Sequence, residues 1–136
     1  MSAFELDGRI DRDSDLVKKL DLCQLRIQND SRWPWLVMVP ERPGMTEIFE
    51  LSAADHALLL SEITKVGAAL KQVTGATKIN TAAIGNIVRQ LHVHVIARFE
   101  GDANWPGPIW GFGQAVPYDD AERQKIFLEK LVKALS

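Results

Sequence analysis

One long periodic segment limits the folds open to this chain of 136 residues. Ser52 followed by Asp55 resembles the N-terminal capping box of a helix, and Gly75 is a typical residue just past a helix end. Between them, apolar residues recur at spacings of four and three, the period of one helix face. These residues are Leu59, Ile63, Val66, Leu70 and Val73. The spacing predicts one long helix over residues 52–75.

The rest of the chain predicts strands before and after this helix. Four segments alternate in polarity, form short apolar runs or are rich in β-branched residues, as strands are. They are residues 20–28, 35–39, 77–80 and 90–98. Asp119 with Glu122 predicts the cap of a C-terminal helix, whose apolar stripe is Phe127, Leu131 and Leu135. This order of elements predicts an α+β fold with a largely antiparallel sheet.

Composition restricts the class of protein. The chain is 46% hydrophobic and 25% charged, as an average soluble globular protein is, and its length suits one hydrophobic core. We therefore expect a single domain over residues 1–136. The net charge of −2, with both signs mixed along the chain, gives no support for binding nucleic acid.

The N-terminal residues lack the basic and apolar regions of a secretory leader, and no apolar run reaches membrane-spanning length. We expect a cytoplasmic location and no membrane partner. The single cysteine, Cys23, has no partner for an internal disulfide, and its apolar neighbours Leu22 and Leu25 indicate a small buried residue.

Two histidines on one predicted strand supply the most specific chemistry. Side chains alternate across a strand, so His92 and His94 lie on one face about 7 Å apart along the chain. A neutral imidazole attacks phosphorus near neutral pH without a separate base, and a protonated second imidazole can hold a phosphate oxygen or assist the leaving group. This pattern favours metal-free phosphoryl or nucleotidyl transfer. A pair of surface histidines, or a metal-ligand pair, is the alternative.

The run over residues 85–98 resembles the motif of the histidine triad (HIT) superfamily, His-φ-His-φ-His-φ-φ with φ apolar. Gln90 stands in the first place, His92 in the middle and His94 in the last. A glycine-bearing loop precedes the motif, as it does in the family, and the order of elements over residues 20–98 also matches.

The resemblance implies an α+β homodimer whose two five-stranded sheets join into one, with a nucleotide-binding cleft in each protomer. It implies a nucleotide hydrolase or nucleotidyl transferase that acts at the α-phosphate through a nucleotidyl-histidine intermediate, without a cofactor. The chain is most similar in this respect to bacterial HIT-domain proteins of the diadenosine polyphosphate hydrolase kind. The expected substrates are diadenosine polyphosphates or nucleoside phosphoramidates.

The resemblance also assigns roles to residues. His92 is the expected nucleophile, and His94 is expected to contact the phosphate. Gly85 and Asn86 belong to the phosphate loop, where glycine lets backbone N–H groups approach an anion. Asn80 is expected near the phosphates, and Asn29 near the ribose.

The chain departs from the family pattern in two places. Gln90 replaces the first histidine, which removes a proton relay, although its amide still donates and accepts hydrogen bonds near the substrate. The loop over residues 32–35 lacks the Pro-Gly-His that many members have, so a substrate contact made there in relatives is not expected.

Three further features have two readings each. Arg98 shares the strand face of His92, and either reaches a phosphate or is solvated. The segment over residues 105–113, rich in Pro, Gly and Trp, either walls a base pocket or packs in the core or a dimer interface. His56 has no partner histidine at a ligand spacing, which favours a structural role over metal binding.

The leading hypothesis is therefore a nucleotidyl hydrolase or transferase. The alternatives are a non-catalytic metal-binding or nucleotide-binding module that uses the His-x-His strand, and a divergent family member that binds a nucleotide as a sensor. Gln90 supports the sensor, and the intact His92 opposes it.

Overall fold

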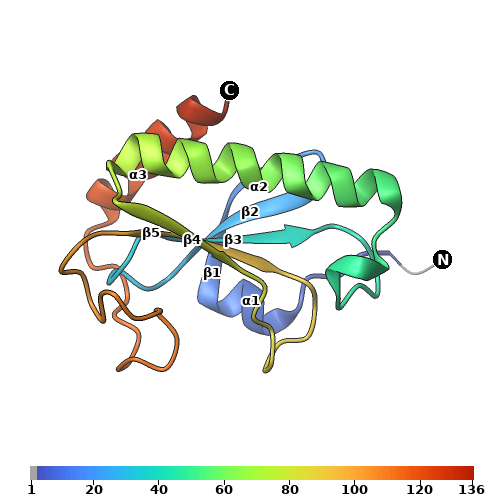
Figure 1. The fold of residues 1–136 in the computed structure, drawn as a ribbon, viewed down its shortest axis with the longest axis horizontal. Helices are drawn as coiled ribbons and strands as arrows, with labels where there is room; N and C mark the ends of the chain where they lie inside the picture. The colour runs from blue at the N-terminus through green and yellow to red at the C-terminus, as the bar shows by residue number, and fades with distance from the viewer. Residues whose placement is uncertain (1–2) are drawn as a thin grey trace.

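The computed structural model describes residues 3–136 as one antiparallel sheet with helices on both faces (Figure 1). The strands are β1 (Ser14–Lys19), β2 (Cys23–Gln28), β3 (Trp35–Pro40), β4 (Lys78–Ala82) and β5 (Val93–Arg98). The helices are α1 (Gly8–Asp13), the 3₁₀ helix η1 (Ile48–Glu50), α2 (Ala53–Thr74) and α3 (Ala121–Leu135). The sheet order is β1-β2-β3-β5-β4, with every neighbouring pair antiparallel. The predicted α+β, five-stranded fold is confirmed.

Met1 and Ser2, which begin the N-terminal stretch that lacks a leader pattern, lie outside the described residues. Within residues 3–136, no helix is both long and apolar enough to cross a membrane.

Successive side chains of β5 point to opposite faces of the sheet. Val93 and Val95 point toward α2 and join the main core, where they pack with residues of α2 such as Val66 and Leu70. Ile96 points the other way, into a smaller apolar cluster. The two histidines therefore lie on the face opposite α2, which α1 and the loops cover (Figure 1).

The long helix is confirmed to the residue. The Ser52 hydroxyl accepts a hydrogen bond from the Asp55 N–H at 3.1 Å, and Gly75 ends the helix in the left-handed region with φ at 69°. The Asp55 carboxylate pairs with Arg42 at 2.7 Å instead of closing a capping box. The C-terminal helix is capped by Asp120, so the predicted cap at Asp119 is wrong by one residue.

Three elements escaped the sequence analysis: α1, β1 and the single turn η1. α1 is only six residues long, too short for a periodic stripe. β1 is an edge strand with exposed polar residues and an irregular register between Leu16 and Lys18, which breaks the alternation of the pattern. The strand predicted over residues 20–28 is shorter in the structure, because a turn occupies its first residues and β2 begins at Cys23.

A buried carboxylate joins α2 to the start of β2. Glu62 is 5% exposed, and its two carboxylate oxygens accept hydrogen bonds from the backbone N–H groups of Leu22 and Cys23 at 2.8 and 2.9 Å. Cys23 itself is fully buried, as predicted, and burial raises the pKa of its thiol. The thiol is therefore an unreactive core group.

We predict that Glu62→Gln destabilises the fold by about 2 kcal/mol. The amide offers one oxygen where the carboxylate offers two, so one buried N–H faces an NH₂ group and loses its acceptor. Urea denaturation measures the free energy of unfolding, with Glu129→Gln, an exposed change on α3, as the control. Equal stability of the two variants would contradict this role of Glu62.

Candidate active site

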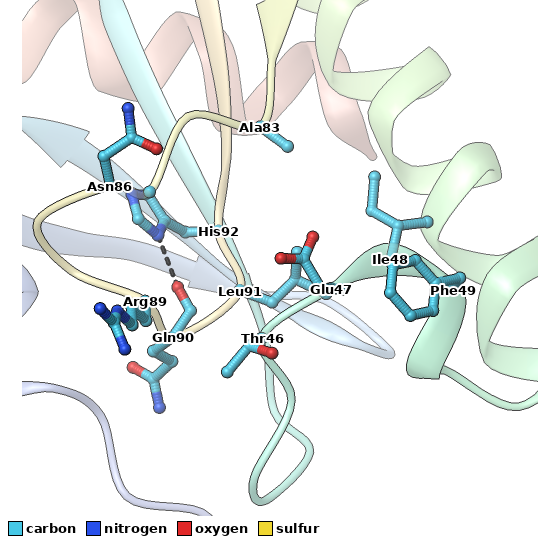
Figure 2. Close-up of a pocket in the computed structure, with 11 residues that line it drawn as sticks. Thr46, Glu47, Ile48, Phe49, Ala83, Asn86, Arg89, Gln90, Leu91 and His92 are labelled. Carbon is cyan, nitrogen blue, oxygen red and sulfur yellow. Dashed lines mark hydrogen bonds between the residues drawn. The ribbon is translucent and has the colours of Figure 1, made fainter.

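A backbone carbonyl fixes the proton of His92. The Nδ1 atom lies 2.7 Å from the backbone oxygen of Gln90 (Figure 2). A carbonyl oxygen only accepts, so Nδ1 carries the hydrogen and donates it. In the neutral ring, the lone pair is then on Nε2. His92 lines a cleft, so this nitrogen has the form required of a nucleophile.

The cleft has a volume of about 750 Å³ and two unlike walls. Its lining residues are Thr46, Glu47, Ile48, Phe49, Ala83, Gly85, Asn86, Arg89, Gln90, Leu91 and His92. Figure 2 shows Asn86, Arg89 and His92 on one side and the side chains of Ile48 and Phe49 on the other. A polar wall with the imidazole therefore faces an apolar wall formed by η1.

Gly85 lies directly against the His92 ring. A Cβ atom on Gly85 would lie 2.6 Å from the Val88 carbonyl oxygen and 3.2 Å from Cε1 of His92. The loop can approach the imidazole this closely only because residue 85 has no side chain. The structure thus brings Gly85 and Asn86 beside His92, and their contact with phosphate remains a prediction.

Both ring nitrogens of His94 are used within the protein. Nδ1 accepts a hydrogen bond from the indole N–H of Trp35 at 3.0 Å, and Nε2–H donates to the backbone oxygen of Ile84 at 3.1 Å. Only the neutral ring fits this pair of partners, because a cationic ring has no acceptor for the indole N–H. Burial, together with the charge of His92, lowers the pKa of His94 to about 4.

The two imidazoles stand side by side, as predicted, with 4.8 Å between ring centroids. The predicted protonated His94, in contact with a phosphate, conflicts with this geometry. His94 is neutral at physiological pH and has no free N–H to offer a substrate. The sequence could not reveal this, because the residue that occupies Nδ1 lies 59 positions away.

Gln90 holds the N-terminal segment to the active-site loop. Its amide oxygen accepts a hydrogen bond from the Asp7 N–H, and its amide nitrogen donates to the Glu5 oxygen, both at 2.8 Å. Hydrogen bonds from Arg9, together with the charge of His92, lower the pKa of Asp7 to about 2. The amide predicted to contact substrate is thus occupied by the backbone, and it brings an ionised Asp7 near His92.

Three predicted substrate contacts lie elsewhere. Arg98 is 1% exposed and makes two hydrogen bonds with the Asp102 carboxylate at 2.8 and 2.7 Å, so it is neither solvated nor free for phosphate. The Asn80 side-chain oxygen accepts from Arg98 at 3.4 Å. The Asn29 side-chain oxygen accepts from the Tyr118 N–H at 3.1 Å. None of these three residues lines the cleft of His92.

The Trp-rich segment over residues 105–113 packs on the same face of the sheet. Ile109 is buried with Trp33 and Ile96, and the Trp110 ring lies 5.2 Å from the ring of His94. The packing reading is confirmed, because this segment does not line the cleft. A further role at a dimer interface remains a prediction.

His56 is exposed at the start of α2. Among residues 3–136, no three His, Cys, Asp or Glu side chains gather as a metal site would require. The sequence analysis missed three groups of site residues: Trp35, the partners of Gln90 near the N-terminus, and the wall over residues 46–49. Each is distant in sequence from the histidine motif, and no local pattern marks it.

Solved structures of histidine triad proteins share this architecture. The chain is similar to one from Sinorhizobium meliloti 1021, at 53% identity and a TM-score of 0.94, with 96% of each chain covered. A protein from Bradyrhizobium japonicum is 40% identical, with a TM-score of 0.96 over 99% of this chain and 100% of its own. One from Marinobacter aquaeolei VT8 is 38% identical, with a TM-score of 0.94 over 98% and 97%.

The model of the HIT domain family matches residues 9–101. The chain therefore belongs to the HIT family, whose proteins bind nucleotides and are generally nucleotide hydrolases or transferases. A search of curated proteins finds no match.

The low pKa of His94 predicts a loss of stability in acid. In the unfolded chain His94 takes up a proton near pH 6.5, whereas in the folded chain it does so only near pH 4. The contribution of neutral His94 to the free energy of unfolding is fully present above pH 6.5, and it decreases by about 3 kcal/mol as the pH falls to 4.

The measurement is urea denaturation at pH 7 and pH 4 of wild type, His94→Gln and His56→Gln. We expect His94→Gln to lose about 3 kcal/mol less than wild type, and His56→Gln to lose as much as wild type. Identical pH dependence in all three proteins would contradict the assignment of a neutral, buried His94.

Proposed function

We propose that this protein is a nucleotide hydrolase or nucleotidyl transferase in which Nε2 of His92 attacks the α-phosphorus. The main support is the hydrogen bond from Nδ1 of His92 to the Gln90 oxygen, which leaves the lone pair on the other nitrogen. The Gly85–Asn86 loop beside the ring offers backbone groups for the phosphate, and Arg89 adds a cation to the same wall. The proposed substrates are diadenosine polyphosphates or nucleoside phosphoramidates.

The proposed reaction has two steps. The Nε2 lone pair forms the N–P bond, and the bond from phosphorus to the leaving group breaks with its electron pair on the leaving atom. The imidazolium that forms is stabilised by the Gln90 carbonyl, since its oxygen already accepts the Nδ1–H. The oxygen of water or of another acceptor then forms a bond to phosphorus and releases its proton to solvent, while the N–P bond breaks and its electron pair returns to Nε2.

The metal-binding alternative has less support. A His-x-His metal pair needs a lone pair from each ring, and Nδ1 of His94 already accepts the indole N–H of Trp35. The nucleotide sensor is a closer alternative, because it needs the same cleft without turnover. The tautomer of His92 favours catalysis, since binding alone does not require a free Nε2.

We predict that His92→Ala lowers AMP release by about 10⁴-fold or more while the chain stays folded. The assay offers diadenosine polyphosphates and adenosine phosphoramidates in the presence of a chelator, with circular dichroism as the check on folding. Mass spectrometry of quenched wild type should find an adenylyl group on His92. Activity that persists in His92→Ala would assign the nucleophile elsewhere, and an absence of activity in wild type would favour the sensor.

The wall opposite His92 suits a second aromatic group on the substrate. Phe49 is 81% exposed, although it lines the cleft. The Glu50 carboxylate holds this segment in place, because one oxygen accepts hydrogen bonds from the N–H groups of Thr46 and Glu47 at 2.9 and 2.8 Å. A rigid, exposed ring across from the nucleophile favours a leaving group that contains a base.

We therefore expect Phe49→Ala to raise KM for a diadenosine polyphosphate about tenfold, the usual effect of losing one stacked base. KM for ATP should stay unchanged, because its pyrophosphate leaving group has no base. Ile87→Ala is the matched control, since Ile87 is 82% exposed and does not line the cleft. An equal change in KM for both substrates would contradict a contact between Phe49 and the leaving nucleotide.

A further inference from the structure

Trp35 fixes the tautomer of His94 from one side, and Ile84 fixes it from the other. The indole N–H of Trp35 can only donate, so Nδ1 of His94 must present a lone pair. The carbonyl of Ile84 can only accept, so Nε2 must carry the hydrogen. The other tautomer would face the indole N–H with an N–H and the carbonyl oxygen with a lone pair.

The surroundings of His94 strengthen this arrangement. The side chain is 6% exposed, and the rings of Trp35 and Trp110 lie 5.7 and 5.2 Å from it. Little water can replace either hydrogen bond at such a site, and a buried cation there would lack solvation. His94 lies 4.8 Å from the nucleophile as a neutral ring that has no proton to give.

The other groups on the nucleophile's side of the cleft are also poor acids. Gln90 and Asn86 have amide side chains, and Arg89 holds its proton firmly. Asp7, near His92, is ionised, because Arg9 holds the pKa of its carboxyl at about 2. Glu47 adds a carboxyl group to the lining of the same cleft, and Figure 2 shows it beside Leu91, between the two walls.

A substrate with a poor leaving group therefore meets no imidazole acid at this site. When a P–O anhydride bond breaks, the electron pair goes to a phosphate oxygen, which is stable as an anion. When a P–N bond breaks, the nitrogen needs a proton as the pair arrives. The following inference rests on the proposed function. We propose that Trp35 is a positioning residue, whose hydrogen bond keeps His94 neutral so that His94 cannot act as an acid. As a result, the site selects phosphate anhydrides over phosphoramidates.

The first experiment compares two substrates that share the adenylyl group. Wild type should cleave ATP, an anhydride whose leaving group has no base, with a kcat/KM at least about 100-fold above that for adenosine 5′-phosphoramidate, the usual contribution of a general acid. Glu47→Gln should keep this ratio. Equal kcat/KM values in wild type, or a loss in Glu47→Gln confined to the phosphoramidate, would overturn the inference.

The second experiment removes the indole donor. Trp35→Phe keeps an aromatic ring but has no N–H, and Trp110→Phe is the matched control, since both rings contact His94 and only Trp35 donates to it. Nitrogen-15 NMR of the imidazoles should show His94 protonated at Nε2 in wild type and in Trp110→Phe. In Trp35→Phe the Ile84 carbonyl still holds the Nε2–H, so we expect His94 to take up a second proton, on the freed Nδ1, at a higher pH than in wild type. The preference for the anhydride should then fall about tenfold or more.

The outcomes separate this inference from the proposed function. If His94 in Trp35→Phe takes up its second proton at the same pH as in wild type and the preference is unchanged, the role of Trp35 is overturned. If that variant does not fold, the wild-type tautomer and the wild-type ratio of kcat/KM values still decide the question. Cleavage of neither substrate by wild type would overturn the proposed function and the selectivity with it, while the NMR spectrum would still test the fixed tautomer.

Discussion

The chemistry of this site depends on one hydrogen bond, from Nδ1 of His92 to the backbone oxygen of Gln90. Without it the imidazole could place its hydrogen on either nitrogen, and only one tautomer has a lone pair on Nε2. The carbonyl is held in place because the side chain of the same residue is fixed by Glu5 and Asp7. Gly85 allows the loop to pack close to the ring, since a Cβ there would lie 2.6 Å from the Val88 carbonyl oxygen and 3.2 Å from Cε1 of His92. Backbone groups around His92 thus set the tautomer that the proposed attack requires.

His94 shows how two identical side chains that face the same way acquire different properties. The strand predicted over residues 90–98 begins only at Val93, so His92 lies just before β5 and His94 lies within it. Each ring donates one N–H to a backbone carbonyl, but through opposite nitrogens: Nδ1 in His92 and Nε2 in His94. His92 lines a cleft, and no residue among 3–136 donates a hydrogen bond to its remaining nitrogen, whereas the remaining nitrogen of His94 accepts from Trp35. Sequence alternation predicts the shared face, and tertiary contacts decide the chemistry.

The amino-acid sequence predicted what local periodicity determines. α2 with its caps Ser52 and Gly75, and the shared face of His92 and His94, follow from spacing alone. The structure departs from prediction where a side chain finds a distant partner. Arg98 shares the strand face of His92 but forms an ion pair with Asp102, whose loop geometry no strand pattern encodes. The side chain of Asn29 likewise bonds to Tyr118, and that of Asn80 bonds to Arg98. The position of a polar residue near the motif therefore did not predict whether it lines the cleft.

Gln90, which stands in place of the first triad histidine, also has partners that are distant in sequence, the backbone groups of Glu5 and Asp7. An amide donates and accepts without titrating, so it joins two backbone groups at any pH, whereas a histidine there would add a third titratable ring beside two others. Three adjacent imidazoles would disfavour the charge of each one, because like charges repel at short distance. With glutamine in the first place and a neutral His94 in the last, His92 is the one ring of the motif placed to gain positive charge in the proposed attack. In the proposed reaction the motif therefore supplies no proton relay and no imidazole acid, and it supplies one imidazole whose tautomer is fixed.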